Sequence, residues 1–120
     1  MQKSVSFHLN LELKSNFSLN KIYAGLHWTK RKKDADYVHQ LVKYSLIEQN
    51  IKPKLFQKPV DIFLYFKTSL DISNTAYIAK LIEDALKGIL IVDDSKKYVR
   101  GLHLIHSDNS GIDCKIMEVE

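Results

Sequence analysis

A strand that is apolar on both of its faces constrains the fold of this chain more than any other feature. Alternate positions of Val60–Thr68 divide into an aliphatic-rich face and a partly aromatic one: Val60, Ile62, Leu64 and Phe66 against Phe63 and Tyr65. A strand of this kind needs cover on both sides, so it lies in the middle of a sheet or in an interface. We therefore expect a sheet built around this segment.

Hydrophobic periodicity predicts one strand and two helices elsewhere. Val5–Leu13 alternates apolar with polar residues, which is typical of a half-buried strand. A first helix is expected over Asp34–Gln49, with Asp34 as its capping residue. A second helix is expected from about Asn74 to Lys87, with Gly88 as its stop signal.

The remaining segments complete a β-loop-α-β-α-β-β order. Ser15–Lys33 has no clear period and predicts an extended loop, and Ser107–Gly111 has the composition of a hairpin loop. Strands are expected on both sides of that hairpin loop, and a short one before them: Tyr98–His106, Ile112–Val119 and Ile89–Val92. The order predicts one α+β domain over residues 1–120, with a small mixed or antiparallel sheet and two main helices.

Composition leaves several function classes open and excludes others. The formal net charge is +4 and the pI about 9.1, a modest excess that permits a polyanionic partner. A lone cysteine, Cys114, excludes an intrachain disulfide and favours a reducing, cytoplasmic location. No segment has the pattern of a signal peptide or a membrane span. The sequence has no Gly-rich phosphate loop, so we expect no nucleotide cofactor.

Carboxylates at two separate points are candidate metal ligands. Asp71 precedes the second predicted helix, and Asp93 and Asp94 follow it. If the helix packs back across the sheet, both points lie at one end of it. Magnesium needs only one or two carboxylates, because it keeps waters and takes phosphate oxygens. The alternative is ordinary: Asp93-Asp94 as a polar turn, and Asp71 to Asn74 as a helix entry.

These residues also carry a family resemblance. The chain contains Asp71-Ile72-Ser73-Asn74, then Lys80, then Asp84-Ala85-Leu86, then Asp93-Asp94. This pattern resembles the RusA family of Holliday junction resolvases, which occur in bacteria and their phages. A weaker match, Ser18 to Tyr23 with Asn20, resembles the Asn-containing N-terminal loop of that family.

The resemblance implies a RusA-like fold, a homodimer and magnesium-dependent cleavage of four-way DNA junctions, with manganese as a possible substitute. It implies metal ligation by Asp71 and Asp94, assistance from Asp93, and contact of Lys80 with the scissile phosphate. Two cuts on opposite strands need two sites, which a twofold dimer supplies. Ser73, Asn74, Asp84 and Asn20 are implied as auxiliary residues.

The chain departs from the family pattern at two points. Ser73 stands where the family has a second aspartate, which lowers the negative charge at the metal and is expected to weaken its binding. Three extra residues separate Asn74 from Lys80, which shifts a helical side chain by about 4.5 Å along the axis. Lys80 and Asp84 are four apart, so a plain surface ion pair is the other interpretation of that pair.

Two basic segments are candidate nucleic-acid contacts. Four cations follow Trp28, and three more follow Asp94: Lys30, Arg31, Lys32 and Lys33, then Lys96, Lys97 and Arg100. Successive cations beside an aromatic residue suit phosphate contact, although short charge runs are often only solvated surface.

Three hypotheses follow. The first is a hydrolase, a Holliday junction resolvase that acts as an endonuclease on branched DNA in recombination or repair. The second is a RusA-like DNA-binding protein whose metal site Ser73 has weakened or abolished. The third is a basic protein-interaction domain, for which partner binding depends little on salt.

Overall fold

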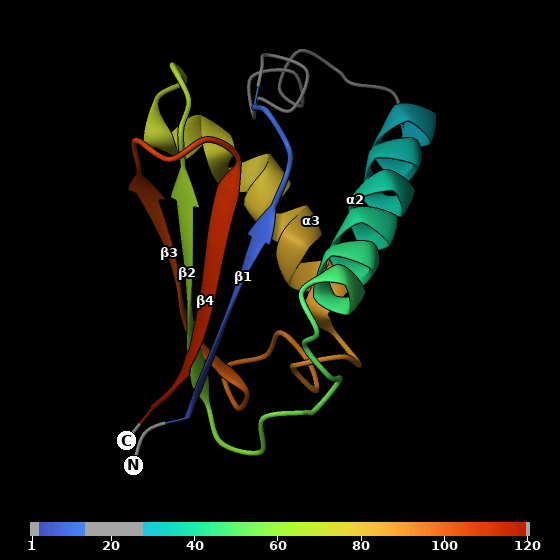
Figure 1. Cartoon of the computed structure of the whole chain (residues 1–120), viewed down its shortest axis with the longest axis vertical. Helices are drawn as coiled ribbons and strands as arrows, with labels where there is room; N and C mark the ends of the chain where they lie inside the picture. The colour runs from blue at the N-terminus through green and yellow to red at the C-terminus, as the bar shows by residue number, and fades with distance from the viewer. Residues whose placement is uncertain (1–2, 14–27, 120) are drawn as a thin grey trace.

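A four-stranded mixed sheet with two helices on one side of it makes up the fold (Figure 1). The computed structural model describes residues 3–13 and 28–119. Its strands are β1 (Ser4–Leu9), β2 (Val60–Phe66), β3 (Val99–His106) and β4 (Ile112–Glu118). Its helical elements are α2 (Trp28–Glu48), the short 3₁₀ helix η2 (Ile72–Thr75) and α3 (Ala76–Leu86). The predicted α+β class with a mixed sheet and two main helices is confirmed.

The strand with two apolar faces lies inside the sheet, as its sequence predicts. The strand order is β1-β4-β2-β3, in which β2 is antiparallel to β4 and parallel to β3. Leu64 of β2 is 0% exposed and pairs with Cys114 of β4, which is 2% exposed. Burial raises the pKa of the Cys114 thiol. Phe63 and Tyr65 lie on the opposite face and are half-buried.

The link from β2 to β3 is a crossover that carries α3 across the sheet. Parallel neighbours require such a connection, and α3 supplies it with the predicted apolar stripe. Ile78, Ile82 and Leu86 of this stripe are 0% exposed. Each such side chain contributes about 1.5–3 kcal/mol relative to an exposed one. Helix α2 packs on α3 and β1, so both helices cover the same face (Figure 1).

The hairpin prediction for Ser107–Gly111 is wrong. This segment does connect β3 to β4, but β2 lies between those two strands. The N–H of Ser107 donates to the carbonyl of Phe66 at the end of β2, which carries the chain past that strand. The residues of a turn predict that the chain reverses direction, but they do not predict which strands are neighbours in the sheet.

Two further boundaries differ from expectation. Ile89–Val92 is no strand but part of a turn closed against α3, because a short apolar run is buried equally well in either form. Helix α2 begins at Trp28, so Asp34 lies inside it and is no cap, and residues 28–33 are helical rather than an extended loop. The rest of that predicted loop, residues 15–27, lies outside the described residues.

Candidate functional site

The chain reverses direction at the end of α3 and returns to the helix. Gly88 has a φ of +81°, a left-handed conformation that glycine adopts without strain, and it ends the helix as predicted. The N–H groups of Leu90 and Ile91 donate to the carbonyl of Leu86 at 3.0 and 3.2 Å. Both side chains are 1% exposed and fix this turn in the core. The loop that follows, which holds Asp94, is thereby returned to α3.

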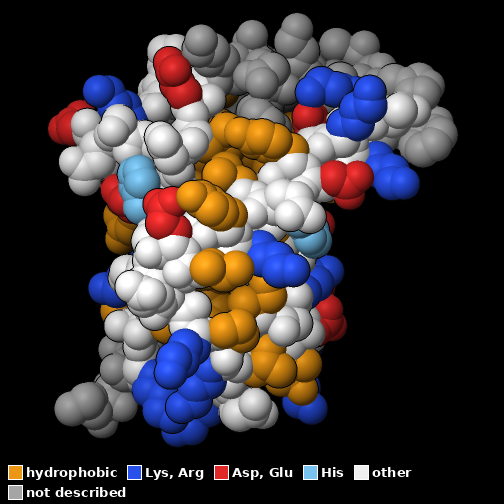
Figure 2. All heavy atoms as spheres, turned by 45° about the vertical axis from the view of Figure 1, so that its right-hand side comes forward, with side chains coloured by type: hydrophobic (Ala, Val, Ile, Leu, Met, Phe, Trp, Pro, Cys, Tyr) orange, Lys and Arg blue, Asp and Glu red, His pale blue; other side chains and the backbone are white. Residues whose placement is uncertain are grey.

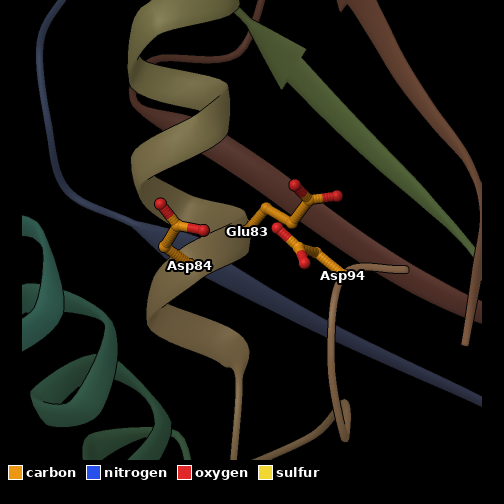
Figure 3. Close-up of side chains that lie close together, drawn as sticks. All are labelled: Glu83, Asp84 and Asp94. Carbon is orange, nitrogen blue, oxygen red and sulfur yellow. The ribbon is translucent and has the colours of Figure 1, made fainter.

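Three carboxylates meet at this point, two from α3 and one from the loop. Oxygens of Glu83, Asp84 and Asp94 lie within 4.8 Å of one another. Figure 3 shows Glu83 and Asp94 pointing toward each other beside the helix, with Asp84 further round its surface. Among residues 3–13 and 28–119, no other three acidic, histidine or cysteine side chains come this close. We call Glu83, Asp84 and Asp94 the acidic group.

Two lysines of the same helix region are paired with the acidic group. The Nζ of Lys80 lies 2.5 Å from Oδ2 of Asp94, 3.2 Å from Oδ1 of Asp84 and 3.3 Å from Oε1 of Glu83. The Nζ of Lys87 lies 3.1 Å from Oδ2 of Asp94 and 3.2 Å from Oδ1 of Asp84. Lys80 therefore bridges the helix to the returning loop.

The electrostatics differ between the members of the acidic group. Hydrogen bonds from Lys80 and Lys87 hold the pKa of Asp94 well below its usual range, and the same contacts raise the pKa of both lysines. Burial raises the pKa of Glu83, against the opposing effect of Lys80. At neutral pH Asp94 is ionised, whereas burial makes the negative charge of Glu83 costly.

One oxygen of the group is buried between the two lysines. The ammonium groups of Lys80 and Lys87 both lie 3.2 Å from Oδ1 of Asp84, although neither has the geometry of a good hydrogen bond. A buried carboxylate oxygen of this kind is a suitable ligand for a hard divalent cation. The donor set thus fits magnesium, provided that the cation displaces the lysines from it.

Asp71 does not join the acidic group. It is exposed and precedes η2, where its carbonyl accepts from the N–H of Asn74 at 2.9 Å. From Ala76 to Asp84 the helix alone rises by about 12 Å, and η2 adds to that separation. One ion reaches ligands at only about 2.0–2.6 Å, so Asp71 and Asp94 do not share an ion in this arrangement. The expected convergence of these two points is not met.

Of the other residues expected at the acidic site, some lie beside the acidic group and others lie far from it. Asp93 is exposed and lies outside the acidic group, although it neighbours Asp94. Ser73 and Asn74 lie on η2, directly after Asp71, at the opposite end of α3. Asn20 lies outside the described residues. The structure therefore brings together Lys80, Asp84 and Asp94 of the predicted set.

The predicted basic contacts lie at two ends of the molecule, which measures 43 Å along its longest axis. Lys30, Arg31, Lys32 and Lys33 are exposed in the first turns of α2, at the top of Figure 1, and Lys30 pairs with Asp34 at 2.6 Å. The loop of Asp94 carries Lys96 and Lys97, with Lys97 above the ring of Tyr98, and the third predicted cation of this group, Arg100, follows in β3.

Arg100 has a partner within the sheet. Its guanidinium donates two hydrogen bonds to Asp61 of β2 and holds the pKa of that carboxyl below its usual value. His103 approaches the same carboxylate at 3.4 Å. This pairing gives Arg100 a structural role beside any contact with nucleic acid.

Sequence reasoning missed Glu83 and Lys87 as parts of this site. A signal was present, because Lys80, Glu83, Asp84 and Lys87 are spaced i, i+3, i+4 and i+7, which places them on one face of a helix. Only Lys80 and Asp84 of that face are among the site residues expected from the sequence.

No protein-family model matches the chain, and no curated protein matches it significantly. The resemblance to RusA resolvases therefore rests on the residues quoted above. Neither helix in the described part of the chain is long and apolar enough to cross a membrane.

Proposed function

We propose that this protein is a magnesium-dependent endonuclease that cleaves branched DNA as a RusA-like homodimer. The observation that carries the proposal is the meeting of Lys80 with Asp94. These two motif residues are 14 apart in sequence and come from different elements, yet their charged atoms lie 2.5 Å apart beside Asp84. Three residues of the pattern, Lys80, Asp84 and Asp94, thus lie together at the end of a crossover helix, which supports the proposal.

Glu83, Asp84 and Asp94 would hold the cation. Magnesium supplies Lewis-acid activation for phosphodiester hydrolysis when it is bound. Lys80 would then leave the carboxylates, turn toward the scissile phosphate and stabilise developing negative charge. The side chain of Lys80 is 53% exposed, so it has room for this movement. Lys96 and Lys97, exposed in the same loop as Asp94, would contact neighbouring phosphates.

A junction-cleavage assay tests the proposal. We expect wild-type protein with Mg²⁺ to cut a synthetic four-way junction in pairs on opposite strands. The variant Asp94→Asn should lower the rate by on the order of 100-fold or more, since loss of a group that merely supports a metal ligand already costs about 10–100-fold. Asp93→Asn is the matched control, since it removes the neighbouring carboxylate outside the acidic group. Failure of the wild-type protein to cut either junction or duplex, while it still binds them, would exclude catalysis.

A second candidate is a DNA-binding protein without nuclease activity. It is favoured by the two lysines that neutralise Asp84 and Asp94, and by the distance of Asp71 from them. Calorimetry with Mn²⁺ separates the candidates, because only the nuclease needs a cation at the acidic group. If the protein is not a nuclease, Ser73→Asp should not create activity, since residue 73 lies at the other end of α3 from the acidic group.

A further inference from the structure

A groove beside the start of β1 combines an apolar floor, a basic rim and a free strand edge. It encloses about 650 Å³. Its apolar lining comes from β1, from the segment 51–58 and from the turn after α3: Val5, Ile51, Leu55, Phe56 and Leu90. Figure 2 shows basic side chains beside hydrophobic ones at the lower end of this side of the molecule, the end at which segment 51–58 lies in Figure 1.

The groove wall is held in place by main-chain bonds at both of its ends. Asn50 has a φ of +60°, and the N–H of Ile51 donates to the carbonyl of Leu46 at 2.8 Å, which ends α2 in a left-handed cap. The N–H of Phe56 donates to the carbonyl of Leu90 at 2.9 Å. Segment 51–58 is therefore a fixed wall rather than a loose connection.

Within residues 3–13 and 28–119, the outer edge of β1 is covered at one point and open beside the groove. β1 is antiparallel to β4, and the N–H of Glu118 donates to the carbonyl of Lys3. The main-chain N–H and carbonyl groups of the odd-numbered residues of β1 therefore point toward β4, and those of the even-numbered residues point away from the sheet. The amide of Gln49 pairs with both the N–H and the carbonyl of His8, at 2.8 and 2.7 Å. Among the described residues, nothing bonds to the outward main-chain groups of Ser4 and Ser6.

The rim of the groove is strongly basic. Four exposed lysines line it, against one carboxylate, that of Glu118: Lys3, Lys52, Lys54 and Lys58. Within residues 3–13 and 28–119, none of these four lysines forms an ion pair. The rim therefore complements an acidic partner.

We propose that this groove binds an extended acidic peptide segment of a partner protein, which adds a strand beside β1 and places one apolar side chain on the floor. Main-chain bonds to an open sheet edge are a recurrent mode of peptide recognition, with pockets for alternate side chains. Single-stranded nucleic acid fits less well, because it stacks bases on exposed aromatic rings. The one aromatic side chain of the groove, Phe56, is 8% exposed. The inference is independent of the proposed nuclease activity.

Fluorescence anisotropy with a labelled peptide tests it. The probe is acetyl-Glu-Asp-Glu-Leu-Glu-Asp-Glu-amide, added to the full chain. We expect saturable binding that weakens by about tenfold or more in the double variant Lys52→Glu/Lys54→Glu, the change that corresponds to about 1.4 kcal/mol. The double variant Lys33→Glu/Lys43→Glu, at two exposed positions of α2, makes the same change in net charge and should bind as wild type does.

The strand edge is tested separately. Ser6→Pro removes the outward N–H of β1 at an edge position that tolerates proline, and Ser6→Ala keeps it. We expect weaker binding in the proline variant only, with its fold checked by circular dichroism. A peptide N-methylated at alternate residues probes the same bonds without changing the protein, and should bind more weakly.

Four outcomes would overturn the inference. The first is no binding at millimolar peptide, and the second is binding that neither the lysine variants nor N-methylation alters. The third is a groove occupied by a second copy of the chain, which sedimentation would reveal as a dimer that Ser6→Pro dissociates. Displacement of the peptide by a single-stranded oligonucleotide, with a loss of oligonucleotide binding in Lys52→Glu/Lys54→Glu, would assign the groove to nucleic acid instead.

Discussion

Replacing Lys80 with methionine should strengthen metal binding while it weakens DNA cleavage. The ammonium group of Lys80 lies within 3.3 Å of all three carboxylates of the acidic group, where a cation would be held. Charges of +1 and +2 about 4 Å apart repel by about 2 kcal/mol at the dielectric constant of water. The water value applies because the Lys80 side chain is 53% exposed and solvent screens it.

A difference of about 2 kcal/mol corresponds to about a 30-fold lower Kd for the divalent cation. Calorimetric titration with Mn²⁺ measures this change directly, and Lys43→Met on the exposed side of α2 is the matched control. The junction assay should meanwhile lose activity in Lys80→Met, since the variant has no cation for the phosphate. Unchanged or weaker Mn²⁺ binding in Lys80→Met would refute the reasoning, because it would mean that the cation does not compete with Lys80.

Further predictions concern stability, measured by urea unfolding. Arg100 holds the pKa of Asp61 below its ordinary value of 3.8. This pair therefore stabilises the fold above about pH 4, and its contribution is lost as the pH falls through the lowered pKa. Asp61→Asn should remove that part of the pH dependence of the free energy of unfolding. Tyr77→Phe should cost about 1–3 kcal/mol, because the Tyr77 hydroxyl donates at 2.8 Å to the buried carboxylate of Asp34; equal stability of the variant would contradict this. Gly88→Ala should cost about 1–2 kcal/mol through its φ of +81° alone, since a Cβ there meets nothing within 4 Å; a stability gain would count against the turn as described.

Patterns that depend on one element were predicted well from the sequence. The two apolar faces of β2 placed it inside the sheet, and the apolar stripe of α3 fixed which side of that helix is buried. Both follow from the periods of strand and helix, which the chain carries locally. These features can be predicted because the burial of each side chain in a strand or helix depends on its own position in the repeat.

Patterns that depend on how elements meet were predicted less well. The neighbour of β4 is β2 rather than β3, and that choice is made by crossover geometry, which loop composition does not encode. The residues of the candidate site were also predicted less well, because their positions depend on how elements meet. Asp94 meets Lys80 because a turn returns the chain to α3, whereas the length of that helix keeps Asp71 away.

The buried thiol of Cys114 provides a way to measure how often the sheet opens in the native protein. It is the only cysteine of the chain and lies in β4, between β1 and β2, at 2% exposure. A thiol reagent can reach it only when the sheet separates, so its labelling rate measures how often the native state opens. That rate needs no added probe and no destabilising substitution. Cations or peptides that bind the folded protein should slow the labelling in proportion to their affinity.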